Sequence, residues 1–270
     1  MNFRILHIAL LLLAMSMSVL SQERLQRLEV ARIRFDGNES FRDDALLAVM
    51  QTKESPAEFW KFMYTISEKL GDKPEYFDRS LYDADYGRLQ TFYKDQGFFD
   101  AHIDTLLRTD FGKKTVAISF IIREGHRALV DTIQRVGFDD LPPALSEEIN
   151  GRPLVEVGDP FIVDRVVGER ARIVKAFSDN GYADVHIDSI VNFRYASTGN
   201  IKLMIALSRG KRYVFGPISV RQDSLAPKGV EESVIRQHLD FQSGDFYSDA
   251  RRKESERNLN RLGVFETSRI

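Results

Sequence analysis

Residues 97–104 read GFFDAHID, and residues 181–188 read GYADVHID. A phenylalanine stands 20 residues before each of these glycines, at Phe77 and at Phe161. A third copy occurs at Gly263-Val264-Phe265, where the aromatic residue comes two positions after the glycine, so the three glycines are separated by 84 and then by 82 residues. Similarity at one nearly fixed period predicts a tandem array of alike structural modules.

Each module is predicted to have the element order β-α-α-β-β. Its first strand is indicated by alternation, because Ala31, Ile33 and Phe35 are separated by polar residues. The second helix carries an apolar stripe at helical spacing and ends at the glycine. Two strands follow, joined by turns at 110–113 and 196–200. We therefore expect an α+β fold of tandem modules, each a three-stranded mixed sheet covered on one side by two helices. The stripe consists of Tyr82, Leu89 and Tyr93 in module 1 and of Val166, Ile173 and Phe177 in module 2.

Residues 1–21 are predicted to be a secretory signal peptide. Arg4 and His7 form a short basic start, an apolar run covers residues 8–15, and small residues precede Gln22. A membrane anchor is the alternative, but the apolar run is shorter than the ~18 residues that span a bilayer. We therefore expect an exported chain.

Composition excludes several classes of protein. The net charge is −2, which provides no basic surface for nucleic acid. The chain has no cysteine, and this excludes disulfide frameworks, thiolate zinc sites and thiol nucleophiles. Hydrophobic residues make up 43%, so we expect each module to be held together by burial of an apolar core.

We predict module 1 at residues 22–125, module 2 at 126–212 and an incomplete module 3 at 213–270. An insertion at about 56–75 separates the two helices of module 1. No Gly/Ser-rich linker lies between modules, which favours a semi-rigid array. Module 3 stops at Ile270, before its last strand, so the sequence is expected to be a fragment of a longer chain.

The order of elements, the glycine–aromatic pair after the second helix and a Gly-x-Arg junction after the last strand resemble the POTRA repeat. POTRA repeats form tandem arms on the BamA/TamA superfamily of outer-membrane barrels, of the bacterial surface antigen type. The resemblance implies an arm at the periplasmic face of the outer membrane, joined to a barrel that this sequence lacks. Such an arm meets unfolded outer-membrane protein clients and accessory assembly subunits. The implied mode of binding is β-augmentation, in which a client chain adds as an extra strand along an exposed sheet edge.

In POTRA domains the edge concerned is the strand before the hairpin. By repeat position this is the strand at 101–108 in module 1 and the strand at 185–194 in module 2. The resemblance therefore implies twelve polypeptide-binding positions: Ala101, His102, Ile103, Asp104, Thr105, Leu106, Val185, His186, Ile187, Asp188, Ser189 and Ile190.

Two other features suggest binding chemistry. His102 and His186 are each flanked by aspartates two residues away on the same strand face, a pattern that could hold a divalent ion. We favour a polar strand face inherited by both repeats, and expect no metal. In the insertion, Phe59, Trp60 and Met63 are candidates for contact with a partner. Here we favour an extra helix that packs its apolar stripe on its own module.

Catalysis is not expected. The chain has five histidines, and no Gly-x-Ser-x-Gly, phosphate-loop or His-Glu-x-x-His motif occurs in it. No cofactor is expected either. Two rival hypotheses stay open: a free-standing periplasmic scaffold of cell division or the envelope, and a metal-dependent hydrolase that uses the two histidine strands.

Overall fold

The computed structural model describes residues 28–220, 231–263 and 269–270. The chain divides into two compact units, Met1–Ala128 and Leu129–Ile270, which are treated separately below. The signal peptide predicted at the N-terminus lies outside the described residues.

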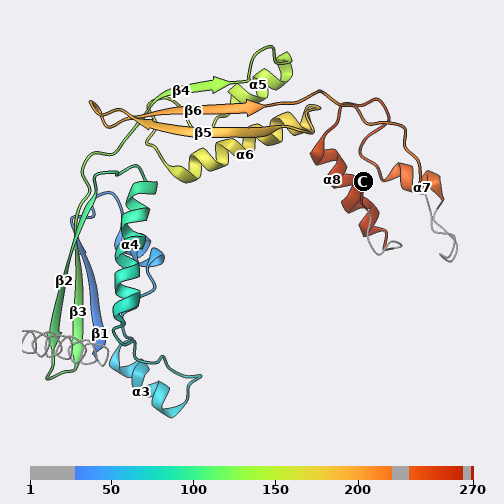
Figure 1. Cartoon of the computed structure of the whole chain (residues 1–270). Coiled ribbons are helices and arrows are strands. Elements are labelled where there is room, and N and C mark those ends of the chain that lie inside the picture. The colour runs from blue at the N-terminus through green and yellow to red at the C-terminus, as the bar shows by residue number, and fades with distance from the viewer. Residues whose placement is uncertain (1–27, 221–230, 264–268) are drawn as a thin grey trace, which may run out of the picture. The chain divides into compact units, whose positions relative to one another are not determined.

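Unit 1 is a three-stranded mixed sheet with helices on one face (Figure 1). The strand order is β1-β3-β2, with β1 parallel and β2 antiparallel to the central strand. This architecture confirms the predicted fold class. The elements are β1 (Glu29–Asp36), α2 (Asp43–Val49), α3 (Glu58–Ile66), α4 (Arg79–Asp95), β2 (His102–Asp110) and β3 (Thr115–Arg123).

The core of unit 1 lies between the sheet and the long helix α4. Tyr82, Leu89 and Tyr93 of α4 are buried, as their helical spacing predicts. The chain then turns at Gly97, whose φ of 92° lies in the left-handed region that favours glycine. Alternate residues of β3 complete the core, and these are Val116, Ile118, Phe120 and Ile122.

Unit 2 repeats this topology over its first 80 residues or so. Its sheet has the order β4-β6-β5, again with one parallel and one antiparallel pair. The α6 stripe of Val166, Ile173 and Phe177 is buried, and Gly181 follows the helix with φ 103°. The elements are β4 (Val130–Val136), α5 (Pro143–Gly151), α6 (Val163–Asp179), β5 (His186–Arg194), β6 (Ile201–Ser208), α7 (Glu232–Gln237) and α8 (Asp249–Arg261).

The last part of unit 2 has the same contact that is found at the start of the two earlier repeats. An isolated antiparallel bridge joins Val214 to Phe246, as Leu129 is joined to Pro160 earlier in the same unit. Unit 1 has the equivalent bridge between Glu29 and Tyr76. In each case the segment that opens the repeat is bonded to the residues just before its second helix. The module boundaries themselves stay a prediction.

The insertion in unit 1 differs from the favoured prediction. The helix α3 does form, but none of its residues is buried. Phe59, Phe62 and Ile66 are about three-fifths exposed, at 61%, 62% and 61%. The prediction that this helix packs its apolar stripe on its own module is therefore wrong. Its apolar spacing is that of a helix with a buried face, and the described residues provide nothing that covers it.

Candidate functional site: two edge strands

The strand β2 carries the first set of predicted binding residues. It stands at the end of its sheet, and no other strand of the described residues pairs with its second side. Its pairing with β3 runs without a shift from His102 opposite Arg123 to Asp110 opposite Thr115. Ala101 directly precedes it. Backbone N–H and C=O groups along such an edge are available to a further strand.

The two faces of β2 differ in polarity. Ile103 is buried on the helix side, and Leu107, on the same side, packs against the core of unit 1. On the outer side His102 Nε2 lies 3.0 Å from Asp104 Oδ1, and Asp104 Oδ2 accepts a hydrogen bond of 3.0 Å from Arg123. At this end of β2 the outer side is therefore polar, and Asp104 contacts both His102 and Arg123.

A groove runs between β2 and α4. Its volume is about 820 Å³, and its lining combines tyrosine rings with a few charged groups. The groove lies beside the free edge of β2, since four of its lining residues belong to that strand. The lining residues are Arg79, Tyr82, Asp83, Tyr86, Ile103, Asp104, Thr105 and Leu107.

The strand β5 carries the second set and is also an edge strand of the described sheet. Its register shifts once, because Ile187 lies opposite Leu207 while Ser189 lies opposite Ala206. Asp188 is thus an extra residue, a β-bulge. Its Oδ2 accepts a hydrogen bond of 2.7 Å from the Ser208 hydroxyl, and its Oδ1 lies 3.1 Å from His186 Nε2. Val185 directly precedes the strand, and Ile190 follows the bulge. Both strands begin with His-Ile-Asp, so these shared residues gave no signal for the shift.

The helix α3 holds the predicted partner-contact residues on the surface. Trp60 is 48% exposed, and Met63 is half-buried. The helix is attached to the module by Lys61, whose ammonium lies 2.6 Å from Glu29. The hydrogen bond that Lys61 donates to Glu29 raises the pKa of Lys61 above its ordinary value. The polar side of α3 is thus anchored, and its aromatic side faces solvent.

A repeated buried acceptor on the second helix was missed by the sequence reading. In α4, Asp85 has no exposed surface and accepts backbone N–H bonds of 2.8 Å from both Gln51 and Thr52. In α6, Glu169 is 1% exposed and accepts a bond of 2.9 Å from the N–H of Leu154. Each ties the loop after the preceding short helix to the long helix. An acidic residue within the apolar stripe was the available signal.

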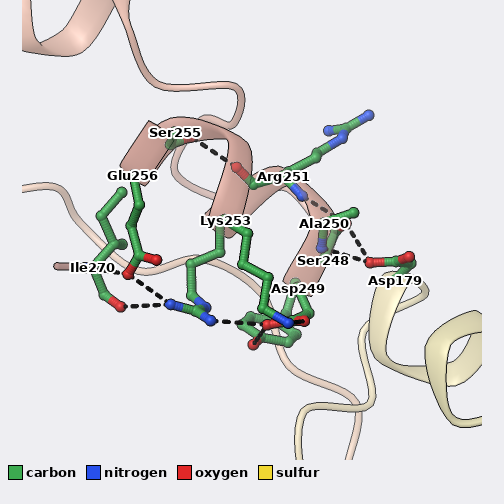
Figure 2. Close-up of polar contacts among 11 residues, drawn as sticks. Asp179, Ser248, Asp249, Ala250, Arg251, Lys253, Ser255, Glu256 and Ile270 are labelled. Carbon is green, nitrogen blue, oxygen red and sulfur yellow. Dashed lines mark hydrogen bonds and ion pairs between the residues drawn. The ribbon is translucent and has the colours of Figure 1, made fainter. Parts of the chain in front are cut away.

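Asp85 and Glu169 each come seven residues after the N-cap of their helix, and the residue at the same place in α8 is Ser255. It is fully buried, and its hydroxyl accepts the backbone N–H of Asp240 at 2.7 Å. The same helix begins beside the end of α6, where Asp179 Oδ1 accepts bonds from Ser248 Oγ at 3.0 Å and from Ala250 N at 2.7 Å (Figure 2). Asp179 therefore completes the cap of α8 from another helix of unit 2.

The described residues contain neither a cluster of metal ligands nor a membrane-spanning helix. Over residues 28–220, 231–263 and 269–270, no three His, Asp or Glu side chains come together as ligands for an ion. Within the same ranges no helix is long and apolar enough to cross a membrane.

Comparison with known proteins finds a family model that matches part of the chain. A family model described as "POTRA: Surface antigen variable number repeat" matches residues 28–125. The chain is 21% identical over 245 residues to a Treponema pallidum (strain Nichols) protein named "Putative outer membrane protein assembly factor". That match covers 88% of this chain and 26% of the relative, so the chain spans about a quarter of the relative's length.

Two solved structures are similar over most of this chain. One is POTRA3-5 of BamA from Haemophilus influenzae, with 17% identity, a TM-score of 0.47 and coverage of 89% of this chain and 87% of that one. The other is the N-terminal domain of Omp85 from Thermosynechococcus elongatus, with 17% identity, a TM-score of 0.38 and coverage of 88% and 87%.

Proposed function

We propose that this chain is a periplasmic polypeptide-binding arm of an outer-membrane protein assembly factor, and the match of residues 28–125 to a POTRA family model supports the proposal. The arm engages client β-strands by β-augmentation. The single observation that carries this proposal is the uninterrupted edge of β2 beside its groove. Main-chain hydrogen bonds along the edge give affinity for any extended segment, and the groove receives alternate side chains.

The proposed partners are unfolded outer-membrane protein clients and accessory assembly subunits. The name of the Treponema relative supports a role in outer-membrane protein assembly. The exposed aromatic residues Phe59 and Trp60 of α3, with Met63 beside them, are the proposed contact for an accessory subunit, since they lie outside the edge and groove. We propose no catalytic step and no cofactor.

The test is a pair of proline substitutions in β2, Thr105→Pro and Leu106→Pro. Neighbouring residues of an antiparallel strand direct their N–H groups to opposite sides. One proline therefore removes a donor from the free edge, and the other removes a donor from the ladder with β3. Hydrogen exchange of the β3 amides identifies which variant keeps that ladder.

The variant with an intact β3 ladder is expected to bind a urea-unfolded outer-membrane β-barrel protein about tenfold more weakly, the equivalent of 1.4 kcal/mol. Binding is measured by fluorescence anisotropy of the labelled client after dilution from urea. The matched control is the same pair of proline substitutions in β1, Arg32→Pro and Ile33→Pro. The edge of β1 that does not pair with β3 is already hydrogen-bonded to neighbouring loops. Unchanged client binding by the folded β2 variant contradicts the proposal.

A further inference from the structure

Within unit 2, the third-repeat segment (residues 213–220 and 231–263) is attached to the C-terminal end of α6 by polar contacts. Asp179, in the last turn of α6, accepts the bonds from Ser248 Oγ and from the N–H of Ala250 at the start of α8 (Figure 2). Its second oxygen lies 2.5 Å from the ammonium of Lys175, one turn earlier in α6. Asp179 is thus held by its own helix while it bonds the next repeat.

Arg212 makes a second attachment, from the short link between β6 and the third-repeat segment. Its Nε donates a bond of 3.0 Å to the carbonyl oxygen of Asn180. Its guanidinium carbon lies 3.5 Å from the centre of the Phe246 ring, just before α8. A cation over the face of an aromatic ring is attracted by the ring quadrupole. Arg212 therefore joins the end of α6 to a ring of the third-repeat segment.

The equivalent arginine of unit 1, Arg127, makes both kinds of contact within one repeat. Its Nε donates to the carbonyl oxygen of Gln96 at 3.0 Å, just as Arg212 donates at the end of α6. Its guanidinium lies over Phe98, 5.3 Å from the ring centre, and Phe98 follows α4 of the same unit. Arg212 thus uses for a bridge between repeats the ring contact that Arg127 makes inside its own repeat.

The backbone beside Arg212 is tied to the same place. The N–H of Tyr213 donates to the Gly181 carbonyl at 2.7 Å, and the Tyr213 carbonyl accepts a bond of 3.0 Å from the N–H of Tyr247. Gly181 permits this approach, because a Cβ there would lie 2.7 Å from Cγ of Arg212. The link is therefore bonded to the end of α6 on one side and to the third-repeat segment on the other.

Farther along, α6 and α8 are separated by a groove of about 480 Å³. Small side chains and charged groups from both helices line it. Opening the joint along this groove would remove little packed apolar surface, so the polar contacts at its end decide whether the joint stays closed. The lining residues are Ala171, Val174, Lys175, Ser178, Asp179, Asp249, Ala250, Lys253 and Arg257.

We propose that Asp179 and Arg212 form a latch that holds the third-repeat segment on the end of α6, and that unit 2 changes shape by opening this latch while both of its repeats stay folded. The two side chains act on one joint, because Arg212 bonds the residue that directly follows Asp179. Loss of either side chain therefore weakens the contacts of the other. The latch does not depend on strand addition at β2 or β5.

Amide hydrogen exchange of the whole chain tests the latch, because each side chain has a reporter amide on the far side of the joint. Arg212→Ala should lower the protection of the Ala250 amide about tenfold, the equivalent of 1.4 kcal/mol. The acceptor of that amide is Asp179, which the substitution leaves in place. Asp179→Ala should lower the protection of the Tyr213 amide, which donates to the Gly181 carbonyl, by a similar factor.

The matched control is Arg127→Ala, which removes the equivalent arginine of unit 1 and should leave the Ala250 amide unchanged. The amides of Ile173 in α6 and Leu259 in α8, whose side chains are buried, should keep their protection in every variant. That result shows that the joint has opened without unfolding of either helix.

A milder variant replaces Arg212→Ala if that substitution unfolds α8. Phe246→Leu removes the ring, which is 51% exposed, and keeps the bond from Arg212 to Asn180. It should lower the protection of the Ala250 amide in the same direction by a smaller factor, because one contact of the latch remains. Full protection of that amide in Phe246→Leu would contradict the bridge through Arg212.

A distance measurement reports the change of shape itself. The chain has no cysteine, so spin labels can be attached at cysteines introduced in place of the exposed Arg170 in α6 and Gln237 in α7. The distribution of distances between the labels should be narrow in the parent chain. It should broaden in the double variant Arg212→Ala, Asp179→Ala.

Two results would overturn the latch. The first is independent behaviour, in which Arg212→Ala leaves the Ala250 amide protected and Asp179→Ala leaves the Tyr213 amide protected. The second is an unchanged distance distribution in the double variant. Since neither measurement involves a client, both results would leave the proposed function as it stands.

Discussion

Unit 1 and unit 2 attach the same loop to the same helix with different side chains. In both, backbone N–H groups of the loop after a short helix donate to a buried carboxylate of the long second helix. Asp85 reaches two such groups directly. Glu169 reaches one, at Leu154, and its second oxygen bonds Arg172 at 2.7 Å. Glu169 thus accepts one backbone bond fewer than Asp85, but it accepts two bonds from Arg172, where Asp85 accepts one from Arg88.

Ser255 shows what the position requires. It makes the same kind of bond, to Asp240, without any charge. The common demand is a buried hydrogen-bond acceptor, because a buried N–H without a partner is costly. The charge is an addition, and each carboxylate is accompanied by an arginine three residues later, Arg88 or Arg172. Predictions that separate acceptor from charge therefore test the comparison.

The largest effect is expected for Asp85→Ala. It leaves two buried N–H groups without an acceptor and Arg88 without its ion pair, and should cost about 3–5 kcal/mol of unit 1 stability. Ser255→Ala removes one neutral bond and should cost about 1 kcal/mol. Native-state hydrogen exchange reports both losses separately in the whole chain. Asp85→Asn keeps one of the two acceptor oxygens and removes the charge, so its loss should lie between zero and that of Asp85→Ala; a loss equal to that of Ala would contradict the requirement for an acceptor.

Acid should distinguish Glu169 from Ser255. Burial alone would raise the pKa of Glu169, but hydrogen bonds from Arg172 and Leu154 outweigh it and the pKa is lowered. A carboxyl with a lowered folded pKa contributes stability above its unfolded value of about 4 and loses it as pH falls through the folded pKa.

The hydroxyl of Ser255 does not titrate in this range. While unit 2 remains folded, exchange protection of the Leu154 amide should therefore fall before that of the Asp240 amide, after correction for intrinsic exchange rates. Simultaneous loss at the two amides at every pH would contradict the assignment.

The parts of the fold that could be predicted are those that depend on the spacing of apolar residues along the sequence. The stripes of α4 and α6, the hairpins and the mixed sheets follow from spacing, because burial selects apolar residues at fixed intervals. The same spacing places Asp85 on the buried stripe between Tyr82 and Leu89, yet a charged residue there reads as an exception. Its partners are backbone groups more than thirty residues away. No local sequence pattern predicts these backbone partners.

The candidate site was predictable in position but not in register. The repeat located both edge strands, and the structure has them where the repeat places them. The bulge at Asp188 depends on the pairing of β5 with β6, through the bond from Ser208. In unit 1 the equivalent residue, Asp104, lies opposite Ile121 without a shift. Identical His-Ile-Asp letters therefore occur in two different ladders.

Helix capping offers a smaller contrast. Asp78 caps its own helix α4 through Ser80 N at 2.7 Å, whereas α8 relies on Asp179 of α6 in addition to Ser248. Asp78→Ala and Asp179→Ala should each cost about 1–2 kcal/mol, the usual value of a cap. The first loss should appear in α4 alone. The second should appear at the first turn of α8 and also loosen α6 from it, measured by exchange of the Ala250 amide. Loss confined to α6 would contradict the shared cap.

The smallest effect concerns α3, which has no counterpart in unit 2. Since none of its residues is buried, Phe62→Ser should change the free energy of unfolding of unit 1 by less than about 0.5 kcal/mol. Phe120→Ser, in the core, is the matched control and should destabilise the unit strongly. Circular dichroism during urea unfolding measures both. A cost above ~1 kcal/mol for Phe62→Ser would mean that the helix packs on its module after all. A unit that keeps its stability when Phe62 is replaced does not need the aromatic face of α3 for folding, as expected of a surface that contacts a partner.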